Sequence, residues 1–203
     1  MKADDISCYG AKIAALRKGV GSDFRLIVRM ENHLAVLKEG EDLARLKTTS
    51  WESLSPDAPE AAVFRRIRGI AALWEEACPW SLRCLADNRS IPAALEDMAE
   101  IVGTKAAIVP FRASALVQAF RRSSGLLVRP GRTYPQGIAM TVGRNPYEAY
   151  IAMTVLEKNA EITQKGDVLG GARPLPLLRA VQLRRTYLYK YSRAERKSHE
   201  SDR

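Results

Sequence analysis

The chain has 203 residues, of which 46% are hydrophobic, a composition that suits one compact domain with a sizeable core. No apolar run approaches the roughly 18 residues of a transmembrane helix, so a membrane span is not expected. The first seven residues include Asp4 and Asp5 and lack an apolar segment, which argues against a signal peptide. Cys8, Cys78 and Cys84 follow no disulfide or zinc spacing, which favours free thiols and a cytoplasmic location.

The formal net charge of +9 is spread unevenly along the sequence. The stretch from Arg184 to Arg203 holds seven Lys/Arg and three Asp/Glu, and so supplies +4 by itself. The other basic residues are scattered or paired on predicted helices, as at Arg121 and Arg122, which is typical of solvated helix faces. Nucleic acid is therefore not the expected partner. The alternative of a basic, nucleic-acid-associated protein depends on the C-terminal stretch.

Hydrophobic periodicity and Gly/Pro punctuation predict an alternation of helices and short strands. Several strands are joined by short turns, which favours a mixed or mainly antiparallel sheet with helices packed on it. One domain is expected over 1–180, followed by a basic helix and polar tail over 181–203. The expected strands are 24–29, 33–38, 43–49, 70–74, 106–111, 125–131 and 137–143. One helix is expected to end at Gly19, and the other expected helices cover 60–68, 78–87, 93–102, 114–122 and 146–165.

Four phrases, in chain order, resemble one protein family. They are Glu-Glu-Ala-Cys-Pro-Trp at 75–80, Asn-Arg-Ser-Ile-Pro at 88–92, Gln-Gly at 136–137, and the segment 142–162, which begins Val-Gly-Arg-Asn-Pro-Tyr-Glu. Together they resemble the class II, zinc-dependent sugar-phosphate aldolases, a family that also includes pentose-phosphate epimerases and the adducin head domain. The resemblance covers about residues 11–179. It implies a three-layer α/β/α fold with a central, mainly antiparallel sheet, and a homotetramer with pockets between subunits.

The resemblance places three zinc-binding histidines at positions where this chain has Glu75, Ala77 and Gln136. Alanine offers no ligand atom, and an amide oxygen is a poor ligand for zinc. His33 and His199 are the only histidines in the sequence. A site with three imidazoles cannot be assembled from one such chain, so zinc is not expected as a cofactor.

The resemblance also implies where catalytic carboxylates would lie. It places the family's acid/base glutamate near Asp57 or Glu60, and the tyrosine of some aldolases near Glu96. Together with Glu75, these residues would line a cavity and act as catalytic residues. Such a cavity could hold Mg²⁺ or Mn²⁺, with Gln136 as a further oxygen donor. The favoured interpretation is the plainer one, in which these carboxylates face solvent from the ends of helices and strands.

The phosphate-binding segments of the family are also altered. Its Gly-Asn-x-Ser turn and its Thr-x-x-Gly segment correspond to 24–27 and 37–40, where Phe-Arg-Leu-Ile and Leu-Lys-Glu-Gly stand. These segments lack the hydroxyl donors of a phosphate cradle, although Arg25 and Arg29 could supply positive charge to a ligand. The competing interpretation places both arginines on the outward face of a strand hairpin.

These departures predict a diverged family member that has lost the zinc and phosphate sites and is non-catalytic. It would act through oligomerisation or by binding a small ligand or a protein. The alternative is a lyase or isomerase that acts through carboxylates on a small hydroxy-carbonyl or sugar-phosphate compound, with or without Mg²⁺ or Mn²⁺.

Overall fold

The computed structural model describes residues 3–17, 24–31, 33–37, 41–46 and 48–201. Eight strands form one sheet in the order β3-β2-β1-β4-β8-β7-β6-β5. Neighbouring strands are antiparallel except β6 and β7, which are parallel. The mainly antiparallel sheet is therefore confirmed. The strands are β1 (Phe24–Arg29), β2 (Leu34–Leu37), β3 (Trp51–Ser53), β4 (Ala72–Glu76), β5 (Ile91–Pro92), β6 (Lys105–Val109), β7 (Gly125–Val128) and β8 (Ile138–Gly143).

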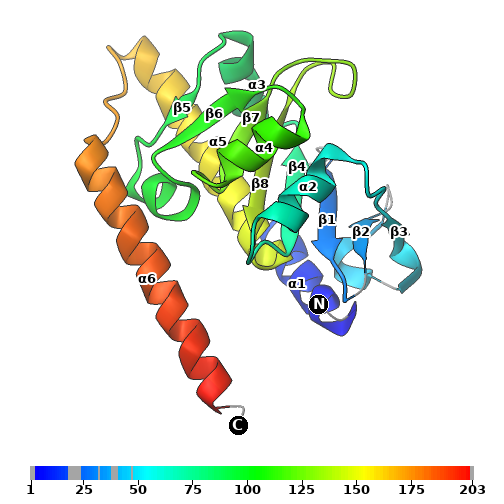
Figure 1. Cartoon of the computed structure of the whole chain (residues 1–203). Coiled ribbons are helices and arrows are strands. Elements are labelled where there is room, and N and C mark those ends of the chain that lie inside the picture. The colour runs from blue at the N-terminus through cyan, green and yellow to red at the C-terminus, as the bar shows by residue number, and fades with distance from the viewer. Residues whose placement is uncertain (1–2, 18–23, 32, 38–40, 47, 202–203) are drawn as a thin grey trace.

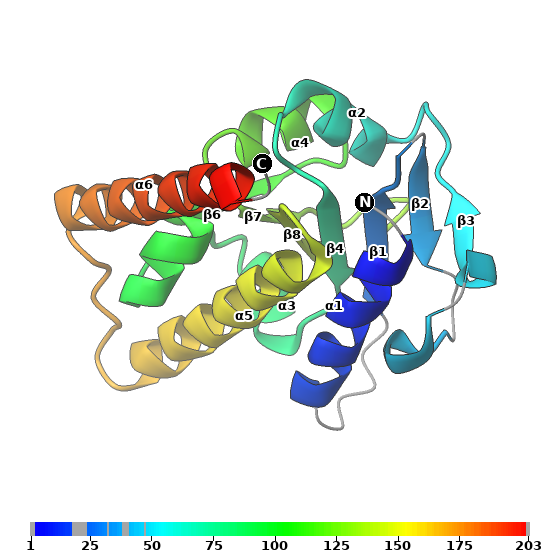
Figure 2. The ribbon, with the colours of Figure 1, turned by 90° about the horizontal axis from the view of Figure 1, so that it is seen from below.

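Helices cover both faces of the sheet, which gives three layers (Figures 1 and 2). α2 and α4 lie together on one face, and α1, α3 and α5 lie on the other. α6 packs against η3, and its C-terminal half extends beyond the rest of the molecule (Figure 1). The helices are α1 (Ala3–Leu16), η1 (Leu43–Arg45), η2 (Thr48–Ser50), α2 (Pro59–Arg66), α3 (Pro79–Ala86), η3 (Met98–Val102), α4 (Ala113–Phe120), α5 (Pro146–Val168) and α6 (Leu177–Ser201). In the described ranges, none of them combines the length and apolar character that a membrane crossing requires.

Strand β4 divides the core into two halves because successive side chains of a strand point to opposite faces. Leu73 packs in the half that contains Phe64 of α2 and Leu116 of α4. Trp74 packs in the other half, with residues of α1, α3 and α5 such as Leu156. All five residues of β4 are buried, so even its two glutamates lie inside the protein.

The expected strand over 43–49 is wrong. Two 3-10 turns, η1 and η2, occupy this region, and the edge strand β3 begins only at Trp51. The reason is contact with α1: a Cβ atom on Gly10 would lie 2.1 Å from the carbonyl oxygen of Leu43. The glycine lets η1 pack directly on the helix backbone, and Leu43 is buried there.

The expected helix over 93–102 is shorter than predicted, because residues 92–95 are tied to α5 in a non-helical conformation. The buried side chain of Asn159 accepts hydrogen bonds from the backbone N–H groups of Ala94 and Leu95, at 2.9 and 3.1 Å. Its amide also donates to the carbonyl of Pro92 at 2.8 Å. These three bonds hold the segment 92–95 in its non-helical conformation.

At the C-terminus, α6 runs from Leu177 to Ser201 and so crosses the expected boundary at 180/181. Ala180 and Leu183, on either side of the boundary, are both buried against the domain. The segment Leu37–Gly40, discussed above as a counterpart of a phosphate loop, is described only at Leu37.

The N-terminus of α3 is capped by a residue of α5. Cys78 precedes the helix and makes no side-chain cap. Instead, the Glu157 carboxylate accepts from the backbone N–H groups of Trp80 and Ser81, at 2.6 and 2.9 Å, and from the Ser81 hydroxyl at 2.7 Å. A carboxylate at this position satisfies free N–H groups and complements the helix dipole.

Replacing Glu157 with alanine is expected to lower the free energy of unfolding by about 2 kcal/mol, because three donors lose their acceptor. Urea denaturation of the Glu157→Ala variant measures this loss. The matched control is Glu161→Ala, one turn further along α5, where the carboxylate pairs with Lys165 near the surface. That change should cost less than about 0.5 kcal/mol. Equal losses in the two variants would contradict the capping role of Glu157.

Candidate functional site

The candidate site begins with a charged pair across two neighbouring strands. In the antiparallel pairing of β1 with β4, Arg25 stands directly opposite Glu75. Side chains of directly opposed residues lie on the same face of a sheet, within contact distance. The Arg25 Nη1 atom lies 3.4 and 3.2 Å from the two carboxylate oxygens of Glu75. The pairing register therefore brings together two residues that are 50 positions apart in the sequence.

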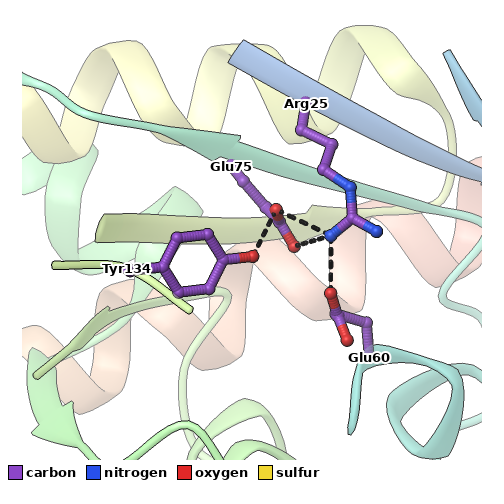
Figure 3. A network of polar contacts seen from close by, with 4 residues as sticks. All are labelled: Arg25, Glu60, Glu75 and Tyr134. Carbon is purple, nitrogen blue, oxygen red and sulfur yellow. Dashed lines mark hydrogen bonds and ion pairs between the residues drawn. The ribbon is translucent and has the colours of Figure 1, made fainter. Parts of the chain in front are cut away.

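Two further residues complete the network (Figure 3). Glu60, in the first turn of α2, accepts a hydrogen bond from Arg25 Nη1 at 2.6 Å. The Tyr134 hydroxyl, from the connection between β7 and β8, donates to Glu75 Oε2 at 2.8 Å. The second oxygen of Glu60, Oε2, is buried and has no hydrogen-bond partner among the described residues. We call Arg25, Glu60, Glu75 and Tyr134 the Glu75 network.

Burial controls the electrostatics of this network. Glu75 is 0% exposed and Glu60 is 2% exposed, whereas 36% of the Arg25 side chain is exposed. Desolvation raises the pKa of Glu75 to about 7; the charge of Arg25 opposes this rise and the charge of Glu60 adds to it. Desolvation and the charges of Glu75 and Glu60 raise the pKa of Tyr134. Its hydroxyl therefore stays protonated and can donate a hydrogen bond. One cation thus faces two carboxylates, and one of these changes protonation near neutral pH.

A second charged pair lies on the opposite face of β4. Glu76 Oε1 lies 3.0 Å from Nη2 of Arg17 in the segment after α1, and Glu76 Oε2 accepts from the Trp74 indole N–H at 2.8 Å. The Arg17 guanidinium also lies over the ring of Phe24, 4.2 Å from its centroid. The two consecutive glutamates therefore serve different faces of the sheet, and they do not form one acidic cluster.

The other residues singled out in the sequence lie outside the Glu75 network. Asp57 is exposed in the turn before α2. Glu96 has 57% of its side chain exposed and pairs with Arg179 of α6 at 2.9 Å. Gln136 is exposed in the turn that precedes β8, and Arg29 donates to the backbone carbonyl of Phe64. Among the described residues, Glu75 is not joined with Asp57, Glu96 and Gln136 in the cavity that was considered as one possibility. The favoured interpretation, with the carboxylates facing solvent, holds for Asp57 and Glu96. It is wrong for Glu60 and Glu75, which are buried and share Arg25.

Tyr134 was missed in the sequence. It stands in an irregular connection, Arg-Thr-Tyr-Pro-Gln-Gly at 132–137, where no hydrophobic period marks the inward-facing residue. The sequence offers one indication of its role: it lies two positions before Gln136, where the resemblance places a zinc-binding histidine. A turn with a hydrogen bond from the Gly137 N–H to the Tyr134 carbonyl leaves Gln136 outside while the tyrosine ring faces Glu75.

The residues at the three positions assigned to zinc histidines do not fit a zinc ion. Both oxygens of Glu75 lie within hydrogen-bond distance of the Arg25 guanidinium, a cation that would repel a divalent metal at the same place. Ala77 has no ligand atom, and Gln136 is exposed in its turn. Throughout the described part of the chain, no three His, Cys, Asp or Glu side chains are grouped as a metal site would require.

Solved structures with the same architecture identify the fold. An L-fuculose 1-phosphate aldolase superposes with a TM-score of 0.71 at 15% identity, over 91% of this chain and 95% of that one. The L-fuculose-1-phosphate aldolase of Thermus thermophilus gives 0.65 at 16% identity, over 85% and 100%. An aldolase II superfamily protein from Pseudomonas syringae gives 0.60 at 11% identity, over 98% and 94%. The chain has the class II aldolase fold. No protein-family model and no curated protein matches the sequence itself.

The class II aldolase fold explains why the sequence resemblance is strongest where the scaffold is built. Asn145 caps α5 by accepting from the Glu148 N–H at 2.9 Å, and Pro146 occupies the first turn of that helix. Glu157 and Asn159, further along α5, hold α3 and the segment 92–95 in place. The phrase 142–162 thus contains several residues that form the start of α5 or position other elements of the fold.

Proposed function

We propose that this chain is a diverged member of the class II aldolase family that does not perform zinc-dependent aldol chemistry and acts by binding. The observation that carries the proposal is the state of Glu75. At a position that the resemblance assigns to a metal ligand, its carboxylate is fully buried and is bound by Arg25 and Tyr134. The ion pair of Glu75 with Arg25 thus lies where the resemblance places the zinc ion.

The two arginines considered for ligand binding support the same proposal. Arg25 is bound to two carboxylates of its own chain, and Arg29 donates to the carbonyl of Phe64. Neither guanidinium is presented to a sugar phosphate in the way that a bidentate phosphate site requires. Both guanidinium groups are thus bound by groups of their own chain.

The binding role that we propose has two forms, which the same scaffold could support: self-association as a homotetramer, and capture of a small carbonyl compound or a protein, as in an adducin-like interaction domain. We place the protein in the cytoplasm. Its three cysteines are free thiols, two of them buried, and this state suits a reducing compartment.

Metal analysis and an activity assay on one preparation test the proposal. The protein is purified without chelators, its zinc, manganese and magnesium are quantified, and cleavage of L-fuculose 1-phosphate is followed with each metal added. We expect less than stoichiometric zinc and no turnover, beside an active L-fuculose-1-phosphate aldolase as the positive control. Stoichiometric zinc together with retro-aldol turnover that Glu75→Ala abolishes would overturn the proposal.

One observation favours a second candidate, a carboxylate-dependent lyase or isomerase. Glu75 has a pKa of about 7 and a tyrosine hydroxyl 2.8 Å away, a combination suited to general acid–base work near neutral pH. The unpartnered Oε2 of Glu60 is an oxygen donor that could help to hold Mg²⁺ or Mn²⁺. Thermal denaturation with and without Mn²⁺ discriminates the candidates: a stabilisation that Glu75→Ala removes would favour the lyase.

A further inference from the structure

A pocket of about 380 Å³ lies between α6 and the domain, away from the Glu75 network. It is lined by Ile70, which precedes β4, and by Gly143, the last residue of β8. Because β4 and β8 are antiparallel, with Ala72 opposite Gly143 and Glu75 opposite Met140, the pocket lies at the other end of these strands from Glu75. Its volume falls in the range of small-molecule sites, roughly 300–1,000 Å³.

The walls of the pocket are largely apolar. The domain contributes Ile70, Phe120 and Val142, and α6 contributes Leu188. Leu188 is 51% exposed. An apolar body that enters between α6 and the domain would cover this leucine and lose its own contact with water.

The charged groups of the pocket are predominantly cationic. Three arginines, Arg68, Arg144 and Arg184, line it together with one acidic residue, Glu148. Glu148 is already paired with Arg144, at 2.6 Å between Oε1 and Nη2. Arg68 is exposed in the turn between α2 and β4 and forms no ion pair with any described residue. The lining therefore keeps two positive charges that its own carboxylate does not offset.

Arg184 is the most constrained of these cations. Its Nη1 donates to the carbonyls of Glu100 and Ile101, at 2.7 and 2.6 Å, and its Nη2 donates to the Ser124 hydroxyl at 2.7 Å. These three partners are neutral, and the guanidinium also lies over the Tyr187 ring, 6.0 Å from its centroid. No carboxylate of the described chain pairs with Arg184. Desolvation lowers the pKa of Arg184. A partly buried cation held only by neutral groups gains from an anion placed beside it.

We propose that this pocket binds a small organic anion with an apolar body, such as an alkyl carboxylate or an aryl sulfonate. The acidic group would lie beside Arg184 and Arg68, and the apolar body would lie against Phe120, Val142 and Leu188. This inference goes beyond the proposed function and uses none of its residues, so a result at Glu75 in either direction leaves it standing.

The first test measures the ligand class with a fluorescent aryl sulfonate, 8-anilinonaphthalene-1-sulfonate. The probe is titrated into the full-length protein, and its displacement is followed with octanoate, octanol and acetate at equal concentrations. We expect saturable binding of the probe that octanoate reverses. Octanol lacks the charge and acetate lacks the apolar body, so both should displace the probe less effectively than octanoate. Displacement by octanol as effective as that by octanoate would overturn the proposal, because it would show that charge plays no part.

The second test places the site with two variants and their matched controls. Arg184→Met removes the constrained cation, and Leu188→Glu puts a carboxylate on the wall at an exposed position, where folding is not at risk. Each should weaken probe binding by at least about tenfold. Arg185→Met and Thr186→Glu make the same charge changes at exposed neighbours outside the lining and should leave the affinity unchanged. Equal affinity in Leu188→Glu and Thr186→Glu would place the probe elsewhere and refute the site.

Discussion

Replacing Arg25 with methionine is expected to lower the free energy of unfolding by about 2–4 kcal/mol at pH 8. The change removes the cation that faces the buried carboxylates of Glu75 and Glu60 and leaves both without a counter-ion. Breaking a fully buried pair costs about 3–5 kcal/mol, and the expected loss is smaller because 36% of the Arg25 side chain is exposed to solvent. Urea denaturation measured at pH 8, where Glu75 is ionised, gives the loss directly.

The matched control is Arg66→Met on α2, an exposed arginine whose replacement should change stability by no more than about 0.5 kcal/mol. The double variant Arg25→Met with Glu75→Gln completes the test. Glutamine keeps an acceptor for Tyr134 and removes the buried charge, so the double variant should regain about 1–3 kcal/mol relative to Arg25→Met alone. If Arg25→Met costs no more than Arg66→Met, the pair does not stabilise the fold.

The sequence predicted the elements whose signals are local. The strands near 125–128 and 138–143 are apolar runs bounded by glycine, and the helix that begins at Pro146 has an Asn-Pro start; all three are confirmed. The segment 43–49 also has apolar residues, but they pack on α1 through Gly10, and a contact between distant segments has no local signature. The helix predicted over 93–102 begins later than expected for the same reason, since Asn159 of α5 binds the backbone at Ala94 and Leu95.

The candidate site was harder to predict because its geometry comes from strand pairing. The sequence singled out Arg25, Glu60 and Glu75, but it gave the arginine and the glutamates separate roles. Only the antiparallel register of β1 and β4 shows that Arg25 and Glu75 are partners. Glu96 was placed with them through the resemblance alone, and the structure instead pairs it with Arg179 of α6. Which residues meet is thus a property of the topology, not of their spacing.

Strand β4 ends in two consecutive buried glutamates, and each pairs with an arginine from a different element, Arg25 for Glu75 and Arg17 for Glu76. Because successive side chains of a strand point to opposite faces, the two pairs lie in different halves of the core. Both cations belong to the chain itself.

Stability between pH 5 and 8 is expected to fall by about 3 kcal/mol through the titration of Glu75. Its pKa is about 7 in the folded protein and near the ordinary value of 4.5 once the chain unfolds. Between pH 4.5 and 7, Glu75 therefore keeps its proton in the folded state and has lost it in the unfolded state. That contribution is complete below pH 4.5 and is lost as the pH rises through 7. Thermal denaturation in a series of buffers measures the decline.

Glu75→Gln should remove this decline, because a neutral amide binds no proton in either state. Glu60→Gln distinguishes between the two coupled carboxylates. Since the charge of Glu60 is one cause of the raised pKa of Glu75, its removal should move the decline to lower pH without abolishing it. A decline that survives in Glu75→Gln would show that Glu75 is not the titrating group. General-base chemistry at Glu75 would then lose its physical basis.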